Sequence, residues 1–153
     1  MKLVAREDIE APIDAVFRQL SDFDGFERAA LRRGAEVQRT DSLTQPGAGM
    51  GWRASFDFRG KERLGEIEMT AYDRPNAMVF QAKGMGVDLE LEMELVSMSP
   101  ARTRLNMSTD IRPRSIPAKL VVQSMKVARS NVLRKYRKRI AKLAEQVEAR
   151  CRG

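Results

Sequence analysis

Side chains that commonly carry out enzyme chemistry are scarce in this sequence. Its 153 residues include no histidine, and the single cysteine, Cys151, cannot form an internal disulfide. Without histidine, the Ser-His-Asp and Cys-His nucleophilic arrangements and the usual zinc sites are excluded. We expect no metal or cofactor, and we interpret Cys151 as an exposed thiol with no catalytic role.

An acidic row is the first candidate for acid–base chemistry. Glu90, Glu92 and Glu94 alternate with apolar residues, and paired carboxylates can transfer protons or bind a hard cation. The alternation places all three on the solvent face of a strand, outside any apolar cavity. Arg102 and Arg104 follow on the next strand and can lie opposite them as cross-strand ion pairs. We therefore interpret the row as a solvated strand surface.

A basic segment is the strongest surface signal. Residues 114–153 carry 12 basic and two acidic residues, a net charge of +10. Residues 1–113 carry 16 basic and 19 acidic residues, a net charge of −3, so the overall charge of +7 comes from the C-terminal segment. An exposed positive helix face suits anionic lipid headgroups or nucleic-acid phosphates, although a merely solvated helix has the same pattern. No aromatic platform or nucleic-acid motif supports RNA or a ribosome over a membrane. The predicted contact residues are Arg134, Lys135, Arg137, Lys138, Arg139 and Lys142.

The elements that would position these residues begin with a strand over residues 3–10. Pro12 is typical of a helix start, and apolar residues recur at helical spacing from Ile13 to Leu20. A second short helix is predicted to end at Gly34, because glycine favours the position after a helix C-terminus.

From residue 36 the hydrophobic period changes to two, which is typical of strands. Six further strands are predicted over residues 36–42, 52–59, 62–72, 78–82, 87–95 and 103–111. The turns between them are short, as antiparallel neighbours require. Pro113 and Pro117 then precede a single basic helix, predicted over about residues 116–150, with an apolar stripe that includes Leu120 and Val132. The pattern predicts one α+β domain spanning residues 1–153.

Three groups of residues also carry a family resemblance. They are Ile9-Glu10-Ala11-Pro12-Ile13-Asp14-Ala15-Val16-Phe17 followed by Leu20-Ser21-Asp22-Phe23, then Gly49-Met50-Gly51-Trp52, and Thr70-Ala71-Tyr72-Asp73-Arg74-Pro75. In these residues and in element order, the chain resembles the Bet v 1-like, or START/SRPBCC, superfamily and its polyketide cyclase/dehydrase and lipid-transport branch. The resemblance covers nearly the whole chain. It implies a helix-grip fold, in which a curved antiparallel sheet of six to seven strands wraps a long C-terminal helix around a hydrophobic cavity.

Apolar residues on the inward strand faces are the candidate ligand site. The predicted lining residues are Trp52, Phe56, Phe58, Met69, Met78, Phe80, Leu91, Met93, Met107 and, from the final helix, Met125. Methionine side chains adapt to irregular apolar shapes, as a binding surface for varied ligands requires. The same residues can equally fill a packed core, and periodicity does not separate the two.

The resemblance implies binding or transport of a small hydrophobic molecule such as a lipid, quinone or polyketide-like compound. Two alternatives remain: an interaction protein whose basic helix engages RNA, a ribosome or an anionic membrane, and a cyclase or hydratase that uses polar groups of the cavity. For the basic helix we favour an anionic membrane, because an apolar cargo must be collected and released somewhere. Tyr72, Tyr136 and carboxylates are the available acids and bases. The sequence shows no secretory signal and no apolar run long enough to span a bilayer, so we expect a cytoplasmic protein of undetermined oligomeric state.

Overall fold

The computed structural model describes residues 1–153 as seven strands and four helices. In chain order these are β1 (Lys2–Ile9), α1 (Ile13–Leu20), α2 (Phe23–Arg32), β2 (Glu36–Arg39), β3 (Gly51–Phe58), β4 (Lys61–Asp73), β5 (Ala77–Gly84), β6 (Val87–Ser99), β7 (Arg102–Pro113), α3 (Ile116–Val127) and α4 (Arg129–Arg152). The predicted α+β class and all seven predicted strands are confirmed.

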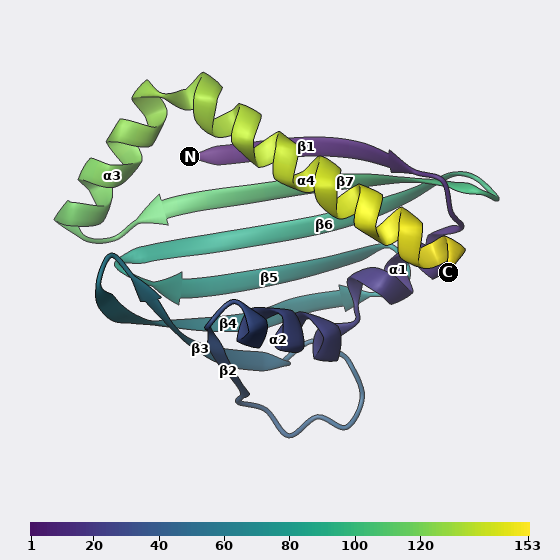
Figure 1. Cartoon of the computed structure of the whole chain (residues 1–153), viewed down its shortest axis with the longest axis horizontal. Coiled ribbons are helices and arrows are strands. Elements are labelled where there is room, and N and C mark those ends of the chain that lie inside the picture. The colour runs from purple at the N-terminus through teal and green to yellow at the C-terminus, as the bar shows by residue number, and fades with distance from the viewer.

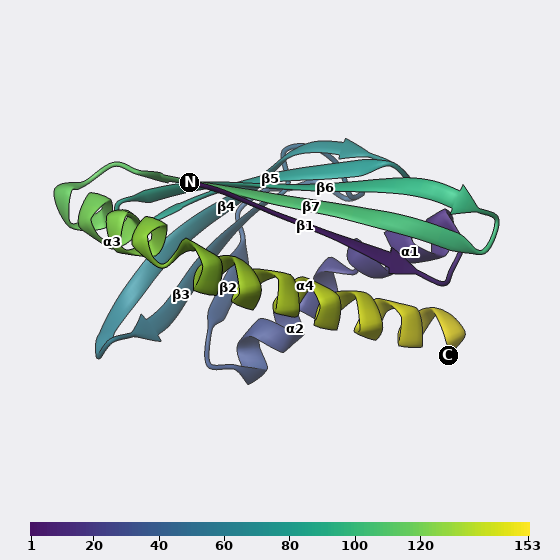
Figure 2. The ribbon, with the colours of Figure 1, turned by 90° about the horizontal axis from the view of Figure 1, so that it is seen from above.

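The strands form one open antiparallel sheet in the order β1-β7-β6-β5-β4-β3-β2. Every neighbouring pair except β1 and β7 is consecutive in the chain, so hairpins build most of the sheet. The sheet is curved, and α1, α2 and α4 lie on its concave side (Figures 1 and 2). This is the predicted helix-grip arrangement.

Local signals explain the two short helices. Pro12 directly precedes α1, and the Asp22 side chain caps α2 by accepting the Gly25 N–H at 3.1 Å. Gly34 follows α2 with a φ of +89°, where a residue with a Cβ atom is strained. The N–H of Ala35 donates to the Ala30 carbonyl at 3.0 Å, which closes the end of the helix.

The hydrophobic core lies between the sheet and the helices α1 and α4. Val16, Phe17 and Leu20 cover one end of the concave face, and Ile140 and Val147 cover the β1 side. Cys151 packs at the edge of this core because it lies one helical turn after Val147. The thiol is therefore half-buried, whereas we predicted it to be exposed.

The predicted helix over 116–150 is wrong in one respect, because the chain bends at Ala128 between α3 and α4. Ala128 has φ −95° and ψ 27°, outside the helical range. The cause is tertiary: Ala118 and Val122 bury α3 against β7, whereas α4 packs on β1. One straight helix cannot make both contacts. Leu120, predicted on the inward stripe, faces solvent because it lies about half a turn around α3 from the buried Ala118 and Val122.

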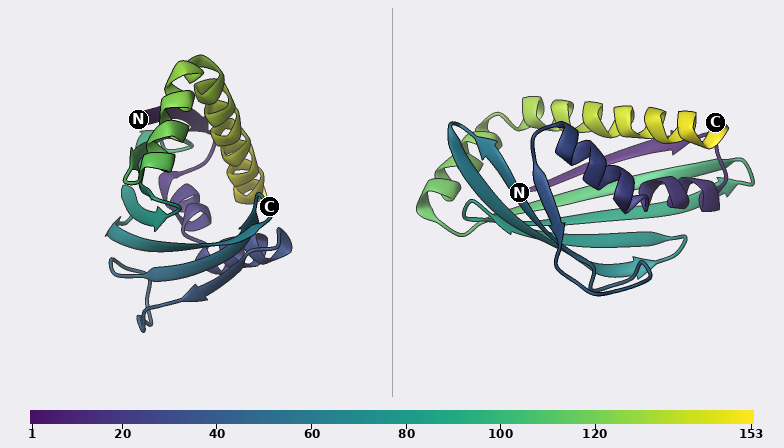
Figure 3. Two further views of the ribbon diagram at one scale, coloured as in Figure 1. Left: turned by 90° about the vertical axis from the view of Figure 1, so that its left-hand side faces the viewer. Right: turned by 60° about the horizontal axis from the view of Figure 1, so that its bottom comes forward.

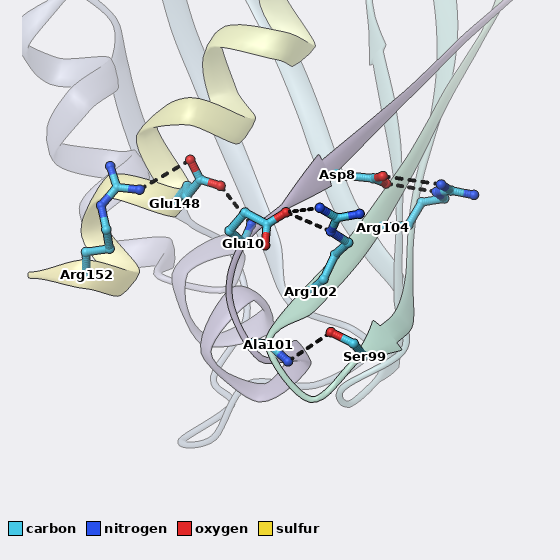
Figure 4. Close-up of polar contacts among 8 residues, drawn as sticks. All are labelled: Asp8, Glu10, Ser99, Ala101, Arg102, Arg104, Glu148 and Arg152. Atoms are coloured by element: carbon cyan, nitrogen blue, oxygen red, sulfur yellow. Dashed lines mark hydrogen bonds and ion pairs between the residues drawn. The ribbon is translucent and has the colours of Figure 1, made fainter.

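Polar contacts tie the end of α4 to β1 and β7 (Figure 4). Glu148 accepts the backbone N–H of Glu10 at 2.7 Å and lies 3.3 Å from the guanidinium of Arg152, and these contacts lower the pKa of the Glu148 carboxyl. The Glu10 side chain in turn accepts from Arg102 at 2.7 Å. The far end of the final helix is thus held at the edge of the sheet.

The predicted pairing of Arg102 and Arg104 with the acidic row is wrong. Strand register places Glu94 opposite Asn106 and Arg104 opposite Val96. Arg102 instead pairs with Glu10, directly after β1, and Arg104 donates to Asp8 on β1 at 2.8 Å, which lowers the pKa of the Asp8 carboxyl. The turn at Pro100 and Ala101, together with a register shift between Ser97 and Ser99, sets this pairing.

Candidate functional site

An apolar pocket lies on the concave face of the sheet, beneath α2. Its volume is about 440 Å³, and 12 of its 14 lining residues are hydrophobic. The lining residues are Leu20, Phe23, Phe26, Glu27, Ala30, Val37, Trp52, Ile67, Phe80, Ala82, Leu89, Leu91, Met93 and Thr109. Phe26 and Leu89 remain partly exposed, so the pocket opens to solvent beside these two side chains.

The wall opposite the sheet is α2, and no residue of α4 lines the pocket. This differs from the predicted cavity between the sheet and the C-terminal helix. Figures 1 and 3 show why, since α4 crosses the β1 side of the concave face while α2 lies over the β2–β4 side. Because α4 packs directly on β1, the space that remains lies under α2.

Four of the ten predicted ligand residues line this pocket: Trp52, Phe80, Leu91 and Met93. Their strands β3, β5 and β6 direct alternate side chains to the concave face, as the alternation predicted. Trp52 is buried, and its ring lies 5.5 Å from that of Phe23 and 6.3 Å from that of Phe80, between centroids.

The other six predicted residues lie elsewhere. Met69, Met78 and Met107 are fully buried in the core, where they fill space and do not reach the pocket. Phe56 and Met125 are half-buried outside the lining. Phe58 is 45% exposed near the β3–β4 turn, where the Arg59 guanidinium lies 5.3 Å from its ring centroid.

A carboxylate is the only ionisable group in the pocket lining. Glu27 lies one turn after Phe23 on α2, and its Oε1 accepts the indole N–H of Trp52 at 2.8 Å. Buried indole N–H groups require a hydrogen-bond acceptor, and Glu27 supplies one. This bond fixes the Trp52 ring and leaves the other carboxylate oxygen without a protein partner in the structure.

A pair of hydroxyl groups supplies the second polar feature. Thr109 on β7 lines the pocket, and its Oγ1 lies 3.0 Å from the hydroxyl of Tyr136 on α4. Burial raises the pKa of Tyr136, with the Thr109 hydrogen bond opposing that rise. Tyr136 therefore stays protonated near neutral pH, and it connects α4 to the pocket indirectly.

An arginine supports the outer edge of Trp52. The Arg39 guanidinium lies 5.7 Å from the centroid of the indole ring and is held by Asp41, which accepts from the Arg39 Nε at 2.8 Å. Asp41 also accepts the Gly51 N–H at 2.9 Å. These donors hold the pKa of the Asp41 carboxyl well below its usual range. The Asp41 contacts thus position both the start of β3 and the arginine that stacks on its tryptophan.

The prediction missed every contribution from α1 and α2. A signal was present in α2, where Phe23, Phe26 and Ala30 recur at helical spacing and Glu27 shares that face. This spacing alone did not predict a pocket, because a short helix that simply packs on a sheet shows the same apolar spacing. Ile67 and Thr109 lie two residues from Met69 and Met107, on the same strand faces that the alternation predicted to point inward.

The acidic row lies on the opposite, convex face, as predicted. Glu92 and Glu94 border a groove of about 590 Å³ with Arg6, Asn106 and Arg137. Only three of its ten lining residues are hydrophobic, so it lacks the apolar surface of the pocket under α2.

The predicted basic contact residues are all exposed on α4. Arg134, Lys135, Lys138 and Lys142 lie on the side of α4 opposite the buried Ile140, and we call these four the basic α4 surface. Arg139 flanks this surface. Arg137 instead turns towards the sheet, where its Nε donates to the Val4 carbonyl at 3.4 Å.

Comparison with known protein families agrees with this geometry. The family model described as polyketide cyclase / dehydrase and lipid transport matches residues 1–148. The chain belongs to this family. No protein of curated function matches the sequence.

Several solved structures have a similar fold. An aromatase/cyclase from a Streptomyces species has a TM-score of 0.65 at 16% identity, with 95% of this chain and 94% of that chain covered. A Thermus thermophilus protein has a TM-score of 0.63 at 20% identity, with 99% and 97% covered. A START superfamily protein from Mycobacterium smegmatis has a TM-score of 0.58 at 13% identity, with 93% and 98% covered. At these identities the likeness concerns the fold alone.

Proposed function

We propose that this member of the polyketide cyclase/dehydrase and lipid-transport family binds a small hydrophobic molecule in the pocket under α2. The observation that carries the proposal is the pocket lining itself. It provides about 440 Å³, enough for a drug-sized molecule, with a nearly continuous apolar wall. The membership of the family supports the same conclusion.

The two polar features restrict the chemistry of the ligand. The free oxygen of Glu27 accepts a hydrogen bond, so a hydroxyl or amino group of the ligand suits that position. The Thr109 and Tyr136 hydroxyls suit a carbonyl, an ether or a hydroxyl. The ligand that fits is therefore a mostly apolar molecule with a donor group and a separate oxygen. Quinols and polyketide-like phenols have this pattern, whereas a plain alkane or an alcohol with a single oxygen does not.

Tryptophan fluorescence provides the test, because Trp52 is the only tryptophan and lines the pocket. We expect saturable quenching or an emission shift with at least one member of a panel of quinones, fatty acids and polycyclic phenols. Ala82→Phe adds a ring inside the pocket and should abolish the response. Ala101→Phe, in the exposed β6–β7 turn, is the matched control and should leave it unchanged. An equal response in both variants, or none from a broad panel in the wild type, would overturn the proposal.

A cyclase or hydratase activity is the second candidate, favoured by the position of Glu27. A carboxylate at the wall of an apolar pocket can remove a proton from a bound substrate. Under this alternative, Glu27→Gln abolishes turnover of a poly-ketone substrate while saturable binding remains. A carrier shows binding without turnover in either form.

None of the four helices is long and apolar enough to cross a membrane. The cytoplasmic location expected from the sequence remains part of the proposal. Fractionation of cells that express the full chain tests this location. A cytoplasmic protein is recovered in the cytosolic fraction, or in the membrane fraction if it is bound to the inner face of the membrane.

A further inference from the structure

The helix α3 is apolar on two opposite sides. Ala118, Val122 and Met125 face the protein, and the first two are buried. Ile116, Leu120 and Val127 are 73%, 65% and 90% exposed. The outward set begins two residues before the inward set, which at 3.6 residues per turn is about half a turn around the helix. The outward side chains thus project directly away from the core.

This exposed side lies at an extremity of the molecule. Figures 1 and 2 both place α3 beyond the end of β7, at the opposite end from the C-terminus. The β5–β6 turn abuts its first turn, since a Cβ added to Gly86 would meet the Ser115 Oγ at 2.3 Å. Met85 in that turn is 48% exposed. The apolar side chains of α3 therefore stand on a projecting ridge and not in a groove.

The charged side chains of α3 itself have one sign. Lys119 and Lys126, one on each side of Leu120 in the chain, lie together on one flank of α3. No acidic residue occurs between Asp110 and Glu145, a stretch that covers all of α3 and most of α4. A projecting apolar ridge flanked by lysines is the pattern of a helix that lies in the interface of an anionic bilayer.

We propose that α3 docks the protein on an anionic lipid surface, with Ile116, Leu120 and Val127 entering the headgroup region. The sequence alone indicated the basic α4 surface for this contact, whereas exposed apolar side chains occur on α3. A second copy of the chain is a poorer occupant, because a symmetric contact across the ridge brings Lys119 and Lys126 of both copies together. The docking does not depend on a ligand in the pocket.

Co-sedimentation with vesicles at an ionic strength of ~0.15 M tests this proposal. We expect the wild type to bind phosphatidylcholine vesicles that contain phosphatidylserine, and not phosphatidylcholine alone. Leu120→Ser combined with Val127→Ser should lower the partition coefficient at least about tenfold, since even half the burial energy of two such side chains exceeds that factor. Lys119→Gln and Lys126→Gln should each lower it about fivefold.

A matched control replaces exposed apolar residues away from α3. Leu31 on α2 and Met98 on β6 are 65% and 46% exposed, and Leu31→Ser with Met98→Ser should bind like the wild type. Unchanged thermal melting of both serine pairs shows that they remain folded. Absence of wild-type binding to anionic vesicles, or equal binding by the two serine pairs, would overturn the proposal. So would a wild-type dimer that only the Leu120→Ser, Val127→Ser pair converts to a monomer.

Discussion

The orientation of α4 can be tested with two valines that lie on the same helix at different depths. Val147 is 1% exposed and belongs to the core, whereas Val132 is only half-buried. The sequence pattern placed Val132 in the middle of a buried stripe, so the structure revises that expectation. Truncation of each valine to alanine removes the same atoms from the same type of element, and the difference between the two variants reports burial alone.

The expected loss at Val147 follows from three effects. Removal of two carbon atoms from the core costs about 1.6 kcal/mol of transfer free energy. The space left behind, about 50 Å³ if nothing relaxes, adds roughly 1.2 kcal/mol. Alanine has a higher helix propensity than valine, which returns about 0.6 kcal/mol. Val147→Ala should therefore lower the free energy of unfolding by about 2 kcal/mol. For Val132→Ala, about half of the transfer effect remains and no closed cavity forms, so its net change should be near zero.

Urea denaturation followed by circular dichroism at 25 °C measures both changes. In thermal melts, the loss at Val147 corresponds to a Tm lower by about 4–8 °C for a chain of this length. Equal destabilisation by the two substitutions, or a larger loss at Val132, would mean that α4 presents a different face to β1. That result would also refute the position of Tyr136 beside Thr109, because Tyr136 shares the inward side of the helix.

Three further outcomes are expected from polar groups. Thr103 is fully buried and donates to the Ala11 carbonyl at 2.8 Å, so Thr103→Val should cost about 1–3 kcal/mol in urea denaturation, and a neutral substitution would show that this bond contributes nothing. The Arg39 guanidinium lowers the pKa of Asp41 in the folded state. The ionised Asp41 carboxylate therefore stabilises the fold fully above the unfolded pKa of about 3.9, and this stabilisation is lost as the pH falls through the lower folded pKa. The difference in Tm between the wild type and Asp41→Asn should thus be present at pH 7 and shrink in strong acid. For the basic α4 surface, filter binding should detect no saturable RNA complex. The expectation would be contradicted by RNA binding in which log K falls with log salt concentration at a slope near −0.7 per phosphate contact, if glutamine substitutions in this surface flatten that slope.

Local sequence patterns determined the elements and the class of fold. Alternation over β3, β6 and β7 predicted which side chains face inward, and Trp52, Leu91 and Met93 do so because a strand has a period of two wherever it is placed. Pro12 and Gly34 predicted the beginning of the first short helix and the end of the second for equally local reasons. The family resemblance carried by short motifs added the curvature of the sheet and its wrapping around the C-terminal helix.

The position of the site depended on contacts between distant elements. Periodicity shows that a helix has an apolar side but not which surface meets it, so the pocket wall on α2 and the Glu27–Trp52 hydrogen bond could not be foreseen. The same limit applies to Met69 and Met78, which face inward as predicted yet fill the core.

Tertiary packing also decided the course of the last forty residues. No glycine or proline marks the bend at Ala128, because the bend arises where contact with β7 ends and contact with β1 begins. Ile116, Leu120 and Val127 share the side of α3 opposite Ala118 and Val122, so the packing of those two residues on β7 leaves the ridge exposed. Local sequence determined which side chains lie on each side of each helix, and only the packing of those helices on the sheet decided which sides were buried.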